Sequence, residues 1–259
     1  MKYAVIADIH GNLEAFRQVL ADIDRSQVDD IVCLGDCIGY GPEPDEVVRL
    51  VRERGIPCVL GNHELGLLDR TYLDWFNPPT RDCLLLTETF LSKAAMDYLG
   101  SFPPALVRHG SRCVHGYPPD SVTTYLFQVA ARELVRSLKA TAEAVCFVGH
   151  THDLAIIGLG SEGLLRLPLG PGVTPLVGAT RWIINVGSVG QPRDGDWRAC
   201  YLSVEDGVAI LQSDEAVLTA VSGVGKKLAA RIQKVENFPR ALPAEVLGPL
   251  AHAGHPPSG

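Results

Sequence analysis

Short apolar runs alternate with amphipathic stretches over the first sixty residues. The runs at 2–7, 30–34 and 56–60 predict three buried strands. Apolar residues recur with helical spacing after Asn12, a good helix-capping residue, and again over 44–54, so a helix is expected in each interval. Strands and helices that alternate in this way, with strands apolar on both faces, are typical of a parallel sheet covered by helices.

The pattern changes after residue 69. Residues 105–108 and 112–115 predict a hairpin, residues 84–99 and 128–139 predict helices, and 144–148 predicts another strand. Beyond residue 153 the apolar runs become short and alternating, which predicts a second, mainly antiparallel sheet. Its expected strands are 154–157, 164–167, 181–186, 200–204 and 208–211.

The same pattern predicts how the chain is divided into a domain, an extension and a tail. Residues 1–212 are expected to form one α/β domain, and 69–104 is expected to be an inserted lid or helical segment. Residues 213–242, with an amphipathic stretch at 214–234, are expected to be a helical extension. The Pro- and Gly-containing residues 243–259 are expected to be a flexible tail.

Composition limits the classes of partner. The net charge of −7 offers no global basic field, so nucleic acid is not expected to be a partner. The apolar run before Asp8 is too short for a secretory signal, and no run reaches the ~18 residues of a membrane helix, so no membrane association is expected.

The seven cysteines lie mostly inside apolar runs and are interpreted as small buried hydrophobes rather than disulfides, in a cytoplasmic protein. Cys33 and Cys37 flank Asp36 at a spacing that could chelate zinc, but no second cysteine pair accompanies them.

Five polar clusters stand out because each one follows an apolar run. Together they supply two Asp, one Asn and five His, a set of ligands that suits a pair of divalent cations sharing one carboxylate. The clusters are Asp8-Ile9-His10, Gly35-Asp36, Gly61-Asn62-His63, Val114-His115-Gly116 and Gly149-His150-Thr151-His152.

The spacing inside the clusters suggests how the ligands divide. Asp8 and His10 leave one strand end two residues apart and can reach a common cation, and His150 and His152 repeat that arrangement. Asp36, alone at its strand end, is the natural bridging carboxylate. A single histidine that follows a strand is usually a hydrogen-bonded loop residue and not a metal ligand. Five clusters of compatible chemistry at successive strand ends favour a binuclear metal site.

The order of these motifs resembles that of the calcineurin-like metallophosphoesterase superfamily. The resemblance covers residues 1 to about 212 and is most specific at 35–42 (GDCIGYGP) and 185–196 (NVGSVGQPRDGD). Both stretches are similar to the small single-domain bacterial and archaeal phosphodiesterases and phosphatases. The fold that this resemblance implies is a four-layer αββα sandwich of two mixed sheets flanked by helices.

The resemblance also implies a role for each residue. One metal would be held by Asp8, His10, Asp36 and His152, and the other by Asp36, Asn62, His115 and His150. The metal pair would be drawn from manganese, iron, zinc, nickel and cobalt. A metal-bridging hydroxide would attack phosphorus while His63 protonates the leaving oxygen as general acid.

Several features keep alternatives open. Arg193 binds a second phosphate or belongs to a turn that braces the metal loops, and Tyr40 lines the pocket or merely packs. Residues 218–232 resemble a helix-hairpin-helix element, although packing of a kinked helix is favoured. The expected function is hydrolysis of a small phosphomonoester or phosphodiester. The alternatives are a dinucleoside polyphosphate hydrolase, a protein phosphatase, a nuclease and a non-catalytic scaffold.

Overall fold

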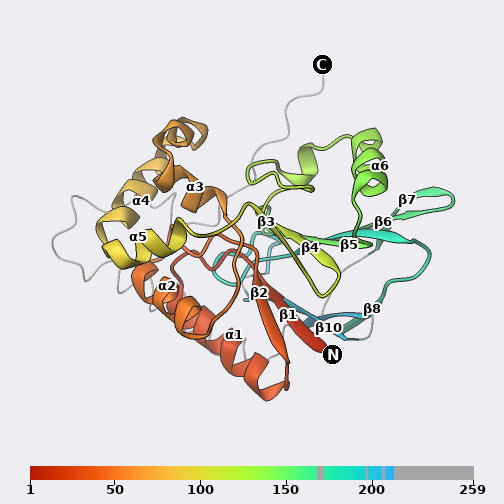
Figure 1. Ribbon diagram of the computed structural model, residues 1–259, viewed down its shortest axis with the longest axis horizontal. Helices are drawn as coiled ribbons and strands as arrows, with labels where there is room; N and C mark the ends of the chain where they lie inside the picture. The colour runs from red at the N-terminus through yellow and green to blue at the C-terminus, as the bar shows by residue number, and fades with distance from the viewer. Residues whose placement is uncertain (168–171, 197, 206–207, 213–259) are drawn as a thin grey trace.

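Two mixed β-sheets pack face to face in the computed structural model, which describes residues 1–167, 172–196, 198–205 and 208–212 (Figure 1). The first sheet has the strand order β2-β1-β10-β11-β8, and the second has β3-β4-β5-β9-β6-β7. The strands of the first sheet are β1 (Lys2–Ile6), β2 (Asp30–Cys33), β8 (Gly172–Pro175), β10 (Tyr201–Glu205) and β11 (Val208–Gln212). The second comprises β3 (Ala105–Arg108), β4 (Ser111–Val114), β5 (Val145–Val148), β6 (Leu154–Gly160), β7 (Gly163–Leu167) and β9 (Arg181–Val186).

Helices cover the outer face of each sheet. Figure 1 shows α1 and α2 beside the first sheet and α6 at the opposite side of the molecule, over the second. The helices are α1 (Leu13–Arg25), α2 (Pro44–Glu53), α3 (Asn62–Leu68), α4 (Pro78–Thr89), α5 (Lys93–Leu99) and α6 (Ala131–Ala140), with 3-10 turns η1 (Arg70–Trp75) and η2 (Leu126–Gln128). This layered arrangement confirms the predicted αββα fold class.

Side-chain alternation along β1 shows how the layers are held together. Ala4 and Ile6 enter a core shared with α1 and α2, whereas Tyr3 and Val5 enter the core between the two sheets. Because successive residues of a strand point to opposite faces, a strand that is apolar throughout must be covered on both sides. A third apolar cluster joins the second sheet to α6.

The predicted strand at 56–60 is wrong. Only an isolated bridge between Cys33 and Cys58 forms there. Pro57 lacks an N–H, and the N–H of Leu60 turns away to donate to the carbonyl of Pro103 at 2.8 Å, so no ladder continues.

The grouping of the later strands also differs from the prediction of one separate antiparallel sheet. β9 pairs in parallel with β5, while β10 pairs antiparallel with β1. The alternation of apolar residues identifies a strand but carries no information on its partner, so these runs divide between both sheets.

The segment 69–104 forms α4 and α5 rather than one long helix over 84–99. Ser92 separates them and caps α5 by accepting the N–H of Ala95 at 3.2 Å. Leu84 and Leu99 are fully buried in the core beside α1 and α2, so the segment packs onto the domain. Its role as a lid stays a prediction.

The predicted helix at 214–234, the helix-hairpin-helix resemblance at 218–232 and the extension and tail at 213–259 lie outside the described residues. The described helices include none long and apolar enough to cross a bilayer. All seven cysteines are buried free thiols, in agreement with the prediction against disulfides.

Candidate metal centre

The five predicted clusters meet at one edge of the two sheets. Asp8 and His10 follow β1, Asp36 follows β2, His115 follows β4, and His150 and His152 follow β5, while Asn62 and His63 open α3. Because β1 with β2 and β4 with β5 run in parallel pairs, each pair brings its carboxyl ends together. All eight side chains are buried, Asn62 being the most exposed at 8%.

These side chains form two groups that share one residue. Asp8, His10, Asp36 and His152 each offer a ligand atom within 4.8 Å of the others, and so do Asp36, His115 and His150. The Asn62 Oδ1 lies 2.9 Å from the His115 Nε2, at the edge of the second group. The structure therefore brings together all seven residues that were predicted from the sequence to be metal ligands, and Asp36 belongs to both groups.

Hydrogen bonds fix the orientation of the first histidine pair. The His10 Nδ1 lies 3.0 Å from the Ile38 carbonyl, and the His152 Nδ1 lies 2.5 Å from the Gln191 carbonyl. Carbonyl oxygens only accept, so both Nδ1 atoms carry the proton and both Nε2 atoms carry lone pairs. These two Nε2 atoms face each other at 3.0 Å. Two facing lone pairs repel, so this arrangement fits a cation held by both rings.

The second pair is oriented in the same way. The His115 Nδ1 lies 2.7 Å from the Leu34 carbonyl, and the His150 Nε2 lies 3.2 Å from the Thr123 carbonyl. The remaining nitrogens, His115 Nε2 and His150 Nδ1, lie 3.1 Å apart. Histidine held by a second hydrogen bond is the usual arrangement around a protein-bound metal.

Electrostatics supports the same interpretation. Burial lowers the pKa of His10 well below its ordinary value and lowers that of His152 to about 3, so both rings are neutral at pH 7. Burial by itself would raise the pKa of Asp36. Electrostatic interaction with His115 and His63 outweighs the effect of burial and holds this pKa well below its ordinary range. For His115, burial is outweighed by Asp36, which raises the pKa to about 10. A cation would replace the proton that His115 carries there.

Unusual backbone conformations concentrate at the same place. Five candidate ligands have positive φ angles: Asp8 at 55°, His10 at 50°, Asp36 at 52°, His150 at 68° and His152 at 60°. Non-glycine residues rarely adopt this region, and strain of this kind is retained mainly where a site requires it.

Residues 185–193, here named the bracing loop, hold the strand ends in place. Asn185 donates from Nδ2 to the Gly149 carbonyl at 2.7 Å. The Ser188 hydroxyl donates to the Asp8 carbonyl at 2.8 Å and accepts the Gln191 N–H at 2.8 Å. Of the two predicted roles for this stretch, its first part therefore acts as a brace.

Arg193 and Tyr40 line the same region. Arg193 donates to the Gln191 Oε1 at 3.0 Å and lies 3.5 Å from the Tyr40 hydroxyl. Its Nε is buried and has no hydrogen-bond partner among the described residues. A buried cationic donor without a partner is a suitable contact for an anionic oxygen.

His63 differs from the other four histidines of the clusters because no carbonyl of a described residue accepts a hydrogen bond from its ring. Its Nε2 lies 4.0 Å from the Asp36 Oδ2, and its Nδ1 is buried without a partner in the described part of the chain. The ring packs between those of His10, Tyr40 and Phe76, with centroids 4.7, 4.8 and 5.3 Å away. Burial lowers its pKa to about 4.

Glu64 belongs to the site although it is not among the residues predicted from the sequence. It is fully buried, and its two carboxylate oxygens accept the N–H groups of Asp36, Cys37, Ile38 and Gly61 at 2.8–3.2 Å. A Glu three residues after the residue that precedes a helix is a capping signal that could have drawn attention to it.

An aromatic pocket adjoins the second ligand group. The Tyr125 ring stacks on that of His150, with centroids 3.8 Å apart and an interplanar angle of 18°. The pocket is lined by Asn62, Tyr72, Trp75, Phe76, Thr123, Tyr125 and His150.

Comparison with known proteins identifies the family. The model of the calcineurin-like phosphoesterase superfamily domain matches residues 1–207. The chain belongs to this superfamily. It is accordingly a metal-dependent phosphoric ester hydrolase of a binuclear superfamily, and the resemblance inferred from the motifs is confirmed.

Individual relatives agree. An uncharacterized protein of Methanocaldococcus jannaschii is 36% identical over 203 residues, which is 76% of this chain and 80% of that protein. The crystal structure of a metallophosphoesterase from Sphaerobacter thermophilus is 31% identical with a TM-score of 0.76, covering 97% of this chain and 99% of that one. A symmetrical bis(5'-nucleosyl)-tetraphosphatase of Wigglesworthia glossinidia brevipalpis is 42% identical over 71 residues, 26% of each chain.

Proposed function

We propose that the protein hydrolyses small phosphomonoesters or phosphodiesters at the two ligand groups that share Asp36. One group is Asp8, His10, Asp36 and His152, and the other is Asp36, Asn62, His115 and His150. The observation that carries the proposal is the pair of facing imidazole nitrogens on each side of Asp36, 3.0 and 3.1 Å apart. Each pair is oriented for a cation by carbonyls behind the rings.

Two divalent cations bound there would supply Lewis-acid charge to the phosphoryl oxygens and an activated water as nucleophile near neutral pH. The oxygen and imidazole donors fit manganese, iron, zinc, nickel or cobalt. Asp36 would balance the charge of both half-sites, since its carboxylate reaches each group.

His63 is assigned the proton transfer to the leaving oxygen. Its ring has no fixed partner and lies beside the shared carboxylate. The lowered pKa makes His63 neutral in the substrate-free protein, but the negative charge of a phosphate ester bound next to it favours the imidazolium. His63 would then donate its Nε2 proton to the departing oxygen.

Arg193 and Tyr40 are assigned to substrate binding. The unpartnered Nε–H of Arg193 and the Tyr40 hydroxyl, 3.5 Å from the guanidinium, supply donors for phosphoryl oxygens beside the ligand groups. The fork of donors on arginine suits two oxygens of one phosphate.

A second candidate function is hydrolysis of a dinucleoside polyphosphate. The aromatic pocket favours it, because rings of Tyr72, Trp75 and Phe76 adjoin Asn62 and His150 and could stack on a base. If so, Trp75→Ala should raise KM for a dinucleoside polyphosphate and leave KM for a methyl phosphodiester unchanged. An equal effect on both substrates would count against this pocket as a base site.

His63→Gln tests the main proposal. We expect its metal content, measured by elemental analysis, to equal that of the wild type while kcat falls about 10²–10⁴-fold. The loss should be larger for an alkyl phosphodiester than for a nitrophenyl one, because a poor leaving group needs the proton more. His109→Gln is the matched control, since His109 pairs with Asp30 away from the site. Equal turnover of both variants on alkyl substrates would refute the role of His63.

A further inference from the structure

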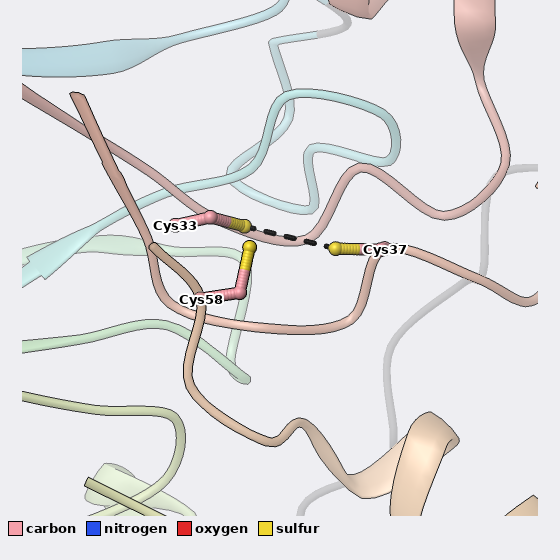
Figure 2. Close-up of side chains that lie close together, drawn as sticks. All are labelled: Cys33, Cys37 and Cys58. Atoms are coloured by element: carbon pink, nitrogen blue, oxygen red, sulfur yellow. Dashed lines mark hydrogen bonds between the residues drawn. The ribbon is translucent and has the colours of Figure 1, made fainter. Parts of the chain in front are cut away.

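The side chains of three cysteines, Cys33, Cys37 and Cys58, lie close together (Figure 2). Cys33 ends β2, Cys37 follows Asp36, and Cys58 is brought beside Cys33 by the isolated bridge. All three sulfur atoms lie within 4.8 Å of one another, and those of Cys33 and Cys37 are 3.8 Å apart. The three side chains are at most 5% exposed.

The spacing of the sulfur atoms matches a metal–thiolate site. Thiolates bound to one zinc ion at about 2.3 Å lie about 3.8 Å apart at a tetrahedral edge. Van der Waals contact between thiols gives a similar distance, so the convergence of a third cysteine is the more informative feature. The sequence offered one pair, Cys33 and Cys37, and the fold adds Cys58 from the segment after α2.

The cluster is chemically distinct from the candidate metal centre. It contains only sulfur donors, which favour soft cations, whereas the centre contains only oxygen and nitrogen donors. The other four cysteines, all described, do not join any such group.

We propose that Cys33, Cys37 and Cys58 bind a third metal ion, a soft cation such as Zn²⁺ or Cu⁺, as thiolates. Binding exchanges three S–H bonds for three metal–sulfur bonds and releases three protons to solvent, with no oxidant involved. The described residues offer this cluster no fourth His, Cys, Asp or Glu ligand. Cu⁺ can bind three thiolates in three-coordinate geometry, whereas Zn²⁺ would need a fourth ligand to complete its tetrahedron.

The position of the cluster indicates what such an ion would do. Between Cys33 and Cys37, the Leu34 carbonyl orients His115 at 2.7 Å, and the Gly35 carbonyl accepts the Asp8 N–H at 3.1 Å. An ion bound to both cysteines would clamp this turn and, with it, the carboxylate of Asp36. Its role is therefore to position the centre rather than to take part in the reaction.

Spectroscopy of the full-length protein separates this ion from the other two. The chain is produced in medium supplemented with Co²⁺, Zn²⁺ or Cu⁺, and its metal content and near-ultraviolet absorption are measured. We expect three equivalents of metal in at least one of the Zn²⁺ and Cu⁺ arms and a sulfur-to-cobalt charge-transfer band in the Co²⁺ arm. Oxygen and imidazole ligands cannot produce that band.

Cys58→Ala is the discriminating variant because Cys58 lies outside the loop that carries Asp36. It should lose the band and one equivalent of metal while keeping the other two, whereas the control Cys146→Ala, another buried thiol, should keep all three. Wild-type protein with two equivalents and no band would overturn the proposal even if Cys58→Ala fails to fold. A Cys33–Cys37 disulfide in protein purified without reductant, with no third metal, would overturn it as well.

Discussion

Glu64 shows how one buried side chain can organise a site without entering it. Burial, followed by the charge of Asp36, raises its pKa to about 8. Its two oxygens nevertheless accept four backbone N–H groups, an environment that favours the carboxylate. Three of these donors belong to residues 36–38, so the conformation of the Asp36 loop depends on Glu64.

Glu64→Gln should weaken metal binding although the side chain keeps its size. The amide NH₂ would face backbone N–H donors, leaving two of them without an acceptor inside the protein. We expect the affinity for the metals to fall about 10–100-fold, the usual effect of changing a residue that orients ligands. Metal titration followed by calorimetry measures this, with the exposed Glu53→Gln as control. An unchanged metal affinity of Glu64→Gln would show that the Asp36 loop keeps its conformation without the Glu64 carboxylate.

Metal binding should depend on pH in a defined direction. Burial raises the pKa of Asp8 to about 6, and Asp36 outweighs burial to raise that of His115 to about 10. Both must lose their protons to bind a cation, so affinity should rise with pH. Between pH 6.5 and 9 His115 is the ligand that remains mostly protonated, so its proton gives about a tenfold increase in affinity per pH unit. Calorimetry in buffers of different ionisation enthalpy counts the released protons, and a flat profile would contradict this prediction.

At the scale of elements, the centre depends on loops that follow parallel strands and on the bracing loop that ties them together. Ser188 is central to that tie, because its hydroxyl bridges the Asp8 carbonyl and the Gln191 N–H. The Gln191 carbonyl in turn orients His152. The conformations of the Asp8–His10 loop and of the His152 loop therefore depend on residues more than thirty positions away in sequence.

Ser188→Ala removes both hydrogen bonds and deprives the partly buried Gln191 N–H of its acceptor. We expect a loss of about 1–3 kcal/mol in the free energy of unfolding. Urea unfolding of the metal-free protein measures it, and Ser101→Ala, at an exposed position, should stay within about 0.5 kcal/mol of the wild type. Equal stability of the two variants would mean that water replaces the Ser188 hydroxyl.

At the scale of the whole molecule, β10 is the element that completes the domain. It lies between β1 and β11, so the strand that leads to Asp8 and His10 is sandwiched between β2 and a strand nearly 200 residues later. The boundary of the catalytic domain must therefore fall after this strand, in agreement with the family match to residues 1–207.

Two truncations test the predicted domain boundary at residue 212. A chain ending at Gln212 keeps both β10 and β11 and should retain metal binding and phosphoesterase turnover within about twofold of the full chain. A chain ending at Gly195 exposes an edge of β1 and should not fold to a stable product. Circular dichroism and turnover of a nitrophenyl phosphodiester report both outcomes. Loss of activity in the longer chain would place residues 213–259 within the functional unit.

Local pattern predicted most elements of this fold and the residue types of its centre, but it missed α3 and β8 and placed a strand at 56–60 where only an isolated bridge forms. Buried runs and polar clusters at strand ends are properties of short segments, so Asp8, Asp36 and His150 could be predicted as ligands once the five clusters were considered together. The pairing partner of each strand could not be predicted in this way, because pairing depends on which apolar faces pack together in the folded protein. For the same reason the runs at 181–186 and 200–204 divide between two sheets instead of forming one.

The sequence by itself determined the set of candidate ligands, which lie in short motifs at predicted strand ends, and the order of those motifs indicated the family and, through that resemblance, the αββα class. Only the tertiary structure decided which carbonyl orients each histidine, how Glu64 holds the Asp36 loop and that Cys58 joins Cys33 and Cys37. These contacts join segments far apart in the chain, and their geometry depends on packing of the two sheets rather than on local preference.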